Sequence, residues 1–104
     1  MSENIIQQKL FDANKIREDF PIFRNNPDLV FLDNASTTQK PQSVIDALSH
    51  YYEHYNSNIH RGIYQIAEKA TVAYEKTRDK VAEFIGTNDR RSIVFTKGLQ
   101  KVLI

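Results

Sequence analysis

The sequence predicts an α/β protein that is mostly helical in this stretch and contains two short strands. Two long segments, 42–55 and 64–85, repeat apolar residues at helical spacing. Two β-prone runs, Leu29–Asp33 and Ser92–Thr96, lie far apart in the chain and predict the strands. Two strands alone do not form a stable sheet, and a helix of about 22 residues needs a broad surface to pack on. The pattern is therefore typical of the opening part of a larger α/β protein.

The composition limits the classes of function. The 104 residues suffice for one domain, and their formal net charge is +1. This balance gives no electrostatic reason to expect a nucleic acid or an anionic membrane as partner. The chain contains no cysteine, so it offers no disulfide, thiolate metal site or thiol nucleophile. Glu3 stands where a signal peptide needs positive charge, and no apolar run approaches a membrane span, so we expect a cytoplasmic protein.

The first third predicts one helix and one strand. Residues 1–10 are polar without a period and are expected to be a flexible N-terminus. Asp12 is a suitable cap for a helix that continues to about Asp19. Pro21 is expected to end this helix, because the residue before a proline avoids helical dihedrals. A turn over 25–28 then leads into the first predicted strand.

The rest of the chain predicts two longer helices and the second strand. Pro41 suits the first position of the helix that runs to Tyr55. Gly62 is expected to allow a bend in the loop before the next helix. The inward face of that helix is predicted to carry Ile66, Ala70, Ala73, Thr77, Val81 and Phe84. Gly86 is expected to end it.

Three loops are candidate sites on composition. The loop Asn34–Lys40, with small and hydroxyl residues before a helix, is either a ligand loop or a helix-capping loop. His60 beside Arg61 pairs a proton carrier with an anion clamp, and the alternative is a polar surface loop. Gly98 follows a predicted strand, as the glycine of a phosphate-binding turn does.

One further pattern is weak. His50 and His54 are four residues apart on a predicted helix, a spacing that can hold a metal ion. We predict a solvated helix face there and no metal site.

The motifs occur together in an order that resembles one family. They are Phe20-Pro21, Phe31-Leu32-Asp33-Asn34-Ala35-Ser36-Thr37-Thr38-Gln39-Lys40-Pro41, His60-Arg61-Gly62-Ile63 and Ile93-Val94-Phe95-Thr96-Lys97-Gly98. The chain resembles the class-V aminotransferase-like enzymes that use pyridoxal 5′-phosphate, and among them the cysteine desulfurases of the sulfur-mobilisation type, which overlap with selenocysteine lyases. The resemblance covers residues 11–98. Residues 99–104 are an out-of-pattern tail, which we expect from a reading-frame shift, with truncation as the alternative.

The resemblance implies a fold and a set of site residues. The fold would be the N-terminal part of a fold-type I pyridoxal-phosphate-dependent transferase. Ala35 and Ser36 match small residues whose backbone lies near the substrate carboxylate. His60 and Arg61 match a pair at the active-site entrance, which this family forms with the partner subunit of its homodimer. Gly98 matches the glycine that opens the phosphate-binding turn, which Leu99 and Gln100 continue out of pattern.

The resemblance also implies an activity. Family members remove sulfur from L-cysteine, leaving L-alanine and a persulfide on an enzyme cysteine, and pass the sulfur to an acceptor protein for iron–sulfur cluster assembly. The Schiff-base lysine and the catalytic cysteine have no counterpart here, so we expect this chain alone to be inactive and not to bind the cofactor. The alternatives are a fragment of a selenocysteine lyase or another class-V enzyme, and a non-catalytic helical interaction module.

Overall fold

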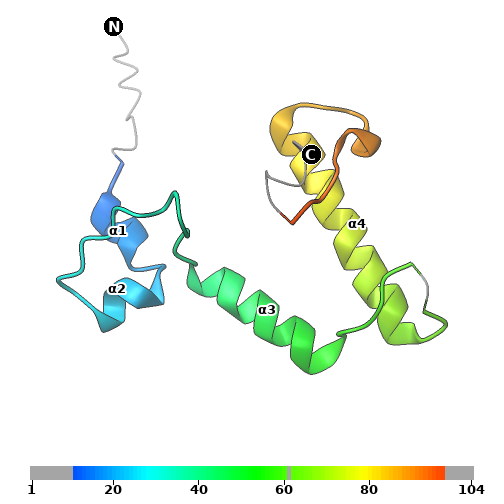
Figure 1. The fold of residues 1–104 in the computed structure, drawn as a ribbon, viewed down its shortest axis with the longest axis horizontal. Helices are drawn as coiled ribbons and strands as arrows, with labels where there is room; N and C mark the ends of the chain where they lie inside the picture. Colours follow the sequence, from blue (N-terminus) through cyan, green and yellow to red (C-terminus); the bar gives the residue numbers. More distant parts are fainter. Residues whose placement is uncertain (1–10, 61, 98–104) are drawn as a thin grey trace, which may run out of the picture. The chain divides into compact units, whose positions relative to one another are not determined.

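A computed structural model describes residues 11–60 and 62–97 of the chain (Figure 1). The chain divides into two compact units, one ending at His50 and the other beginning at Tyr51, and each is described by itself. The predicted flexible N-terminus, Arg61, Gly98 and the 99–104 tail lie outside the described residues. The helices are α1 (Ala13–Arg17), α2 (Pro21–Asn25), α3 (Gln42–His54), α4 (Gln65–Ile85) and the 3₁₀ helix η1 (Arg90–Ser92).

The first unit opens with two short helices where the sequence predicted one. The capping role of Asp12 is confirmed, because its carboxylate accepts from the amides of Asn14 (3.0 Å) and Lys15 (3.2 Å). Helix α1 ends at Arg17, two residues before the predicted end. Pro21 both follows this end and occupies the first turn of α2, a helix that we did not predict. A proline is well suited to that position because its missing amide has no partner there in any helix.

Both predicted strands are wrong: the structure assigns no strand within residues 11–60 and 62–97. The segments keep the alternation of a strand, since Ile93 is buried while Leu32 and Val94 are 92% and 75% exposed. A strand also needs a neighbour to pair its backbone groups. Here arginines supply donors instead: Arg17 donates to the carbonyl of Leu29 (3.2 Å) and Arg78 to that of Ile93 (2.7 Å).

The two long helices are confirmed, each within a residue of the predicted ends. Helix α4 ends at Ile85 and is capped by Gly86, whose φ of 79° is left-handed, and the amide of Thr87 donates to the carbonyl of Ala82 (3.0 Å). No helix among the described residues is long and apolar enough to cross a membrane.

The predicted inward face of α4 is only partly correct. The buried side chains on this helix are Ala67, Ala70 and Ala82, so only Ala70 of the predicted set is buried. Phe84 is 91% exposed, and Ile66 is also exposed. Small alanine side chains are covered by the loop and the 3₁₀ helix that pack on α4, whereas large side chains need a broader partner surface.

Candidate functional site

The turn that carries Ala35 and Ser36 lies in the first unit and closes on itself. The hydroxyl of Ser36 donates to Oδ1 of Asp33 (2.8 Å). The amides of Ser36 and Thr37 both donate to the carbonyl of Asp33 (3.1 and 3.2 Å). The first amide of α3, at Gln42, donates to the carbonyl of Asp19 (2.8 Å). The turn is therefore held by Asp33, and Ala35 and Ser36 are exposed.

His60 lies in the second unit and is held in an uncommon conformation. Its φ is 63°, a left-handed value that non-glycine residues adopt rarely. The sequence placed the bend of this loop at Gly62, but the left-handed residue is His60. The His60 amide donates to Oγ1 of Thr71 (3.0 Å), and this hydroxyl donates to the carbonyl of Ala67 (2.8 Å). The side chain of His60 is half exposed.

The imidazole of His60 contacts two further residues of α4. Its Nε2 lies 3.3 Å from Oε1 of Glu75, and its ring meets the ring of Tyr74 edge-on at 5.8 Å between centroids. Glu75 Oε2 also pairs with Nε of Arg78 (3.3 Å) and with Arg90 (3.5 Å). Glu75 thus joins the His60 loop to two arginines.

A hollow of about 490 Å³ opens beside this cluster. His60, Gly62, Gln65, Glu68 and Thr71 line it, together with the apolar side chains Ile63, Tyr64 and Val72. It contains no lysine that could join covalently to an aldehyde cofactor. These described residues do not fit pyridoxal phosphate by themselves, and they form a mixed polar and apolar wall with one imidazole at its edge.

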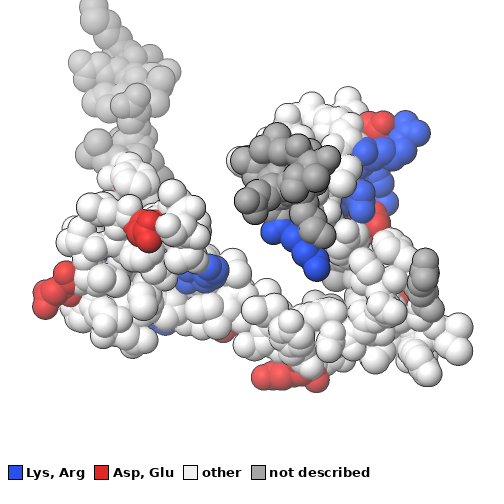
Figure 2. All heavy atoms as spheres, viewed as in Figure 1, with Lys and Arg blue, Asp and Glu red and all other residues white. Residues whose placement is uncertain are grey.

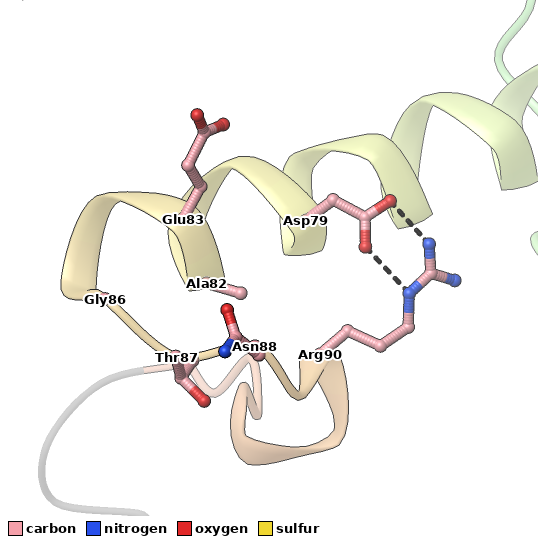
Figure 3. A pocket seen from close by; sticks show the side chains of 7 residues that line it. All are labelled: Asp79, Ala82, Glu83, Gly86, Thr87, Asn88 and Arg90. Atoms are coloured by element: carbon pink, nitrogen blue, oxygen red, sulfur yellow. Dashed lines mark hydrogen bonds and ion pairs between the residues drawn. The ribbon is translucent and has the colours of Figure 1, made fainter.

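A second hollow lies at the other end of α4, where η1 packs back on the helix (Figure 3). Arg90 forms two parallel hydrogen bonds with Asp79, one of them 2.7 Å long, and this pairing raises the pKa of Arg90. Positive and negative side chains adjoin on this unit in Figure 2 as well. Arg90 is the cation among the described residues that line this hollow, and it is already paired with Asp79, so they offer no free cation to an anionic ligand.

Asp89 caps η1 and gives a pH-dependent prediction. Its hydrogen bonds to the side chain and amide of Arg91 lower its pKa below the ordinary value of 3.8. A carboxyl group whose pKa is lowered on folding stabilises the fold above the ordinary value, and the contribution is lost as the pH falls through the lowered pKa. We expect the protection of the Arg91 amide against exchange, corrected for its intrinsic pH dependence, to be weaker at pH 2 than at pH 6. Asp89→Asn should weaken the protection at pH 6; equal protection in the variant would contradict this role.

The predicted site residues do not all lie in one unit of the chain. Ala35 and Ser36 belong to the first unit and His60 to the second, while Arg61 and Gly98 lie outside the described residues. His54 lies 3.9 Å from the neighbouring Glu53, and no group of three metal-binding side chains occurs within the described part of the chain. The sequence analysis missed Thr71, Tyr74 and Glu75 around His60. A signal for Thr71 and Glu75 was present in the sequence, because residues four apart on a helix lie on the same face.

Comparison with known proteins decides the family. The aminotransferase class-V family profile matches residues 30–101, which is most of the chain. The chain belongs to the aminotransferase class-V family. Its match includes both the Ala35–Ser36 turn and the His60 loop.

Several similar proteins are described as cysteine desulfurases. A probable cysteine desulfurase of Streptomyces coelicolor is 52% identical over 98 residues, which is 90% of this chain and 23% of that protein. Another, of Mycolicibacterium paratuberculosis, is 51% identical over 93% of this chain and 15% of its own length. The apo structure of a cysteine desulfurase from Thermococcus onnurineus aligns with a TM-score of 0.77 and 34% identity, covering 90% of this chain and 22% of that one. The chain thus spans about a quarter or less of these relatives.

Proposed function

We propose that the chain is the N-terminal segment of a cysteine desulfurase. The observation that carries the proposal is the 52% identity with a probable cysteine desulfurase over 90% of this chain. The structural similarity to a solved cysteine desulfurase, at a TM-score of 0.77, agrees with that alignment. A longer protein would also supply cover for the exposed Leu32, Phe84 and Val94.

The proposed reaction moves the sulfur atom of L-cysteine from carbon to the thiol of an enzyme cysteine. The C–S bond of L-cysteine breaks, its sulfur forms a bond with the thiol of an enzyme cysteine, and the carbon takes up a proton to give L-alanine. The products are L-alanine and a persulfide, so the atoms balance without an added oxidant or reductant. This chain contains no cysteine, so the accepting thiol would come from outside these 104 residues. Pyridoxal phosphate would act as the electron sink.

The residues of this chain would line the substrate pocket and its entrance, and the Schiff-base lysine and the catalytic cysteine would come from outside it. The turn at Ala35 and Ser36 would lie near the substrate carboxylate, where its small side chains admit a ligand to the backbone. His60 and Arg61 would stand at the entrance, which the partner subunit of a homodimer completes. Gly98 would open the turn toward the cofactor phosphate. In this proposal the enzyme is cytoplasmic and passes sulfur to an acceptor protein for iron–sulfur cluster assembly.

The proposal is tested by grafting. In the Streptomyces coelicolor relative, the matched segment is replaced by residues 11–97 of this chain. Alanine formation is then measured with L-cysteine and, separately, with L-selenocysteine, in the presence of pyridoxal phosphate. We expect activity with L-cysteine. A folded graft that acts on neither substrate would contradict the proposal.

A further inference from the structure

The left-handed conformation of His60 is maintained by contacts from one face of α4. A non-glycine residue at a φ of 63° costs free energy and persists only where the surrounding structure holds it. The described contacts that hold it come from Thr71, Tyr74 and Glu75. Thr71 and Glu75 are one turn apart, so one face of the helix contacts both the backbone and the side chain of His60.

Thr71 makes the backbone contact through a relay. Its Oγ1 accepts from the His60 amide at 3.0 Å and donates to the carbonyl of Ala67 at 2.8 Å. Because a hydroxyl has one proton, the donation to Ala67 leaves the oxygen lone pairs directed to the loop amide. Ala67 is itself fully buried in α4, so the relay is anchored at a fixed point of the helix.

Glu75 makes the side-chain contact. A carboxylate only accepts hydrogen bonds, so at 3.3 Å from Nε2 it favours a proton on that nitrogen. In the neutral imidazole, Nδ1 is then the unprotonated nitrogen and can accept a hydrogen bond from a ligand. His60 also lines the 490 Å³ hollow, whose other residues include Gln65 and Glu68.

We infer that Thr71 is a positioning residue for His60, with Glu75 fixing the imidazole that Thr71 places at the edge of the hollow. The inference rests on the proposed function, because His60 meets substrate only at the entrance of a complete enzyme. Thr71 is the better residue to change, since Glu75 also pairs with Arg78 and Arg90 and its loss would disturb three contacts.

The helix offers a matched control for Thr71. Thr77 also donates its hydroxyl to the carbonyl four residues earlier, that of Ala73, at 3.0 Å. Within the described residues, no backbone amide of the 58–64 loop donates a hydrogen bond to the Thr77 hydroxyl. Thr71→Val and Thr77→Val therefore remove the same hydroxyl from the same helix, and only the first removes the partner of His60. Thr71→Ser retains that partner.

The experiment uses these three variants in the active graft. We expect Thr71→Val to lower kcat/KM for L-cysteine about fivefold and to speed amide exchange at His60 about fivefold, as expected for the loss of one hydrogen bond. Thr71→Ser should stay within twofold of the unsubstituted graft in both measurements, and Thr77→Val should change neither. Circular dichroism melting confirms that each variant is folded.

Two results would overturn the inference. One is a folded Thr71→Val graft with unchanged His60 exchange; the other is faster exchange with unchanged kcat/KM. If Thr71→Val does not fold, Thr71→Ser and Thr71→Ala decide: equal losses in both would overturn the inference, and loss in Thr71→Ala alone supports it. An inactive unsubstituted graft would refute the proposed function instead, and exchange at His60 would still report on the contact.

Discussion

The 104-residue chain, mixed with pyridoxal phosphate and L-cysteine, should form no alanine and no sulfide above the protein-free background. The first reason is that the chain contains no cysteine to accept sulfur. The second is that the described residues lining the hollow beside His60 include no lysine to hold the cofactor covalently. Because an enzyme of this kind works through the combined groups of its site, the loss should be complete and not graded.

The assay needs two comparisons. The intact Streptomyces coelicolor relative, at the same concentration, shows that the assay detects alanine and sulfide. Borohydride treatment followed by mass spectrometry tests whether any lysine has joined the cofactor. Alanine formation by the chain alone, or a specific reduced adduct on one lysine, would contradict the expectation.

Gly62→Ala should destabilise the second unit more than a methyl group added at Gly86, the other glycine among the described residues. A Cβ at this position would lie 2.1 Å from the Cβ of Ala67, which is far closer than two carbon atoms can approach. Ala67 is buried in α4 and cannot rotate away. Overpacking of this kind costs about 1–3 kcal/mol, so we expect the melting temperature of the graft to fall by several degrees.

The control for Gly62→Ala combines it with Ala67→Gly, which removes the methyl group that the new side chain would meet. Ala67→Gly alone should cost about 1 kcal/mol, because glycine is a poor helix former. In the double variant the two methyl groups no longer collide, so its destabilisation should be less than the sum of the single ones. A destabilisation of the double variant equal to the sum of the two single ones would show that the two positions do not touch. Gly86→Asn serves as a second comparison, since a Cβ there meets nothing within 4 Å.

The sequence was sufficient for features that depend on neighbouring residues. Asp12 as a cap, Gly86 as a helix end and both long helices follow from local rules, and the structure confirms them. The strands failed because pairing is not local: Leu29–Asp33 and Ser92–Thr96 have strand composition, but a ladder needs a partner strand. Helix α2 was missed because Pro21 was treated only as a stop, although proline also begins helices.

The candidate site also combines local features, which the sequence predicts, with contacts between distant residues, which it does not. The motif at His60 is visible in sequence, whereas its left-handed φ and its partners on α4 require a fold that brings residues 60 and 71 together. Gly62 was assigned a role in bending the loop, and the structure gives it a role in close approach to Ala67. Both glycine roles require a missing side chain, so composition alone does not distinguish them.

The most direct test of the account is the rate of alanine formation from L-cysteine by the graft that carries residues 11–97. The account predicts a rate within tenfold of the intact Streptomyces coelicolor relative, and no detectable rate for that relative without its matched segment. A graft that folds, as judged by circular dichroism and gel filtration, and binds pyridoxal phosphate but forms no alanine would contradict the claim that this chain is a cysteine desulfurase segment.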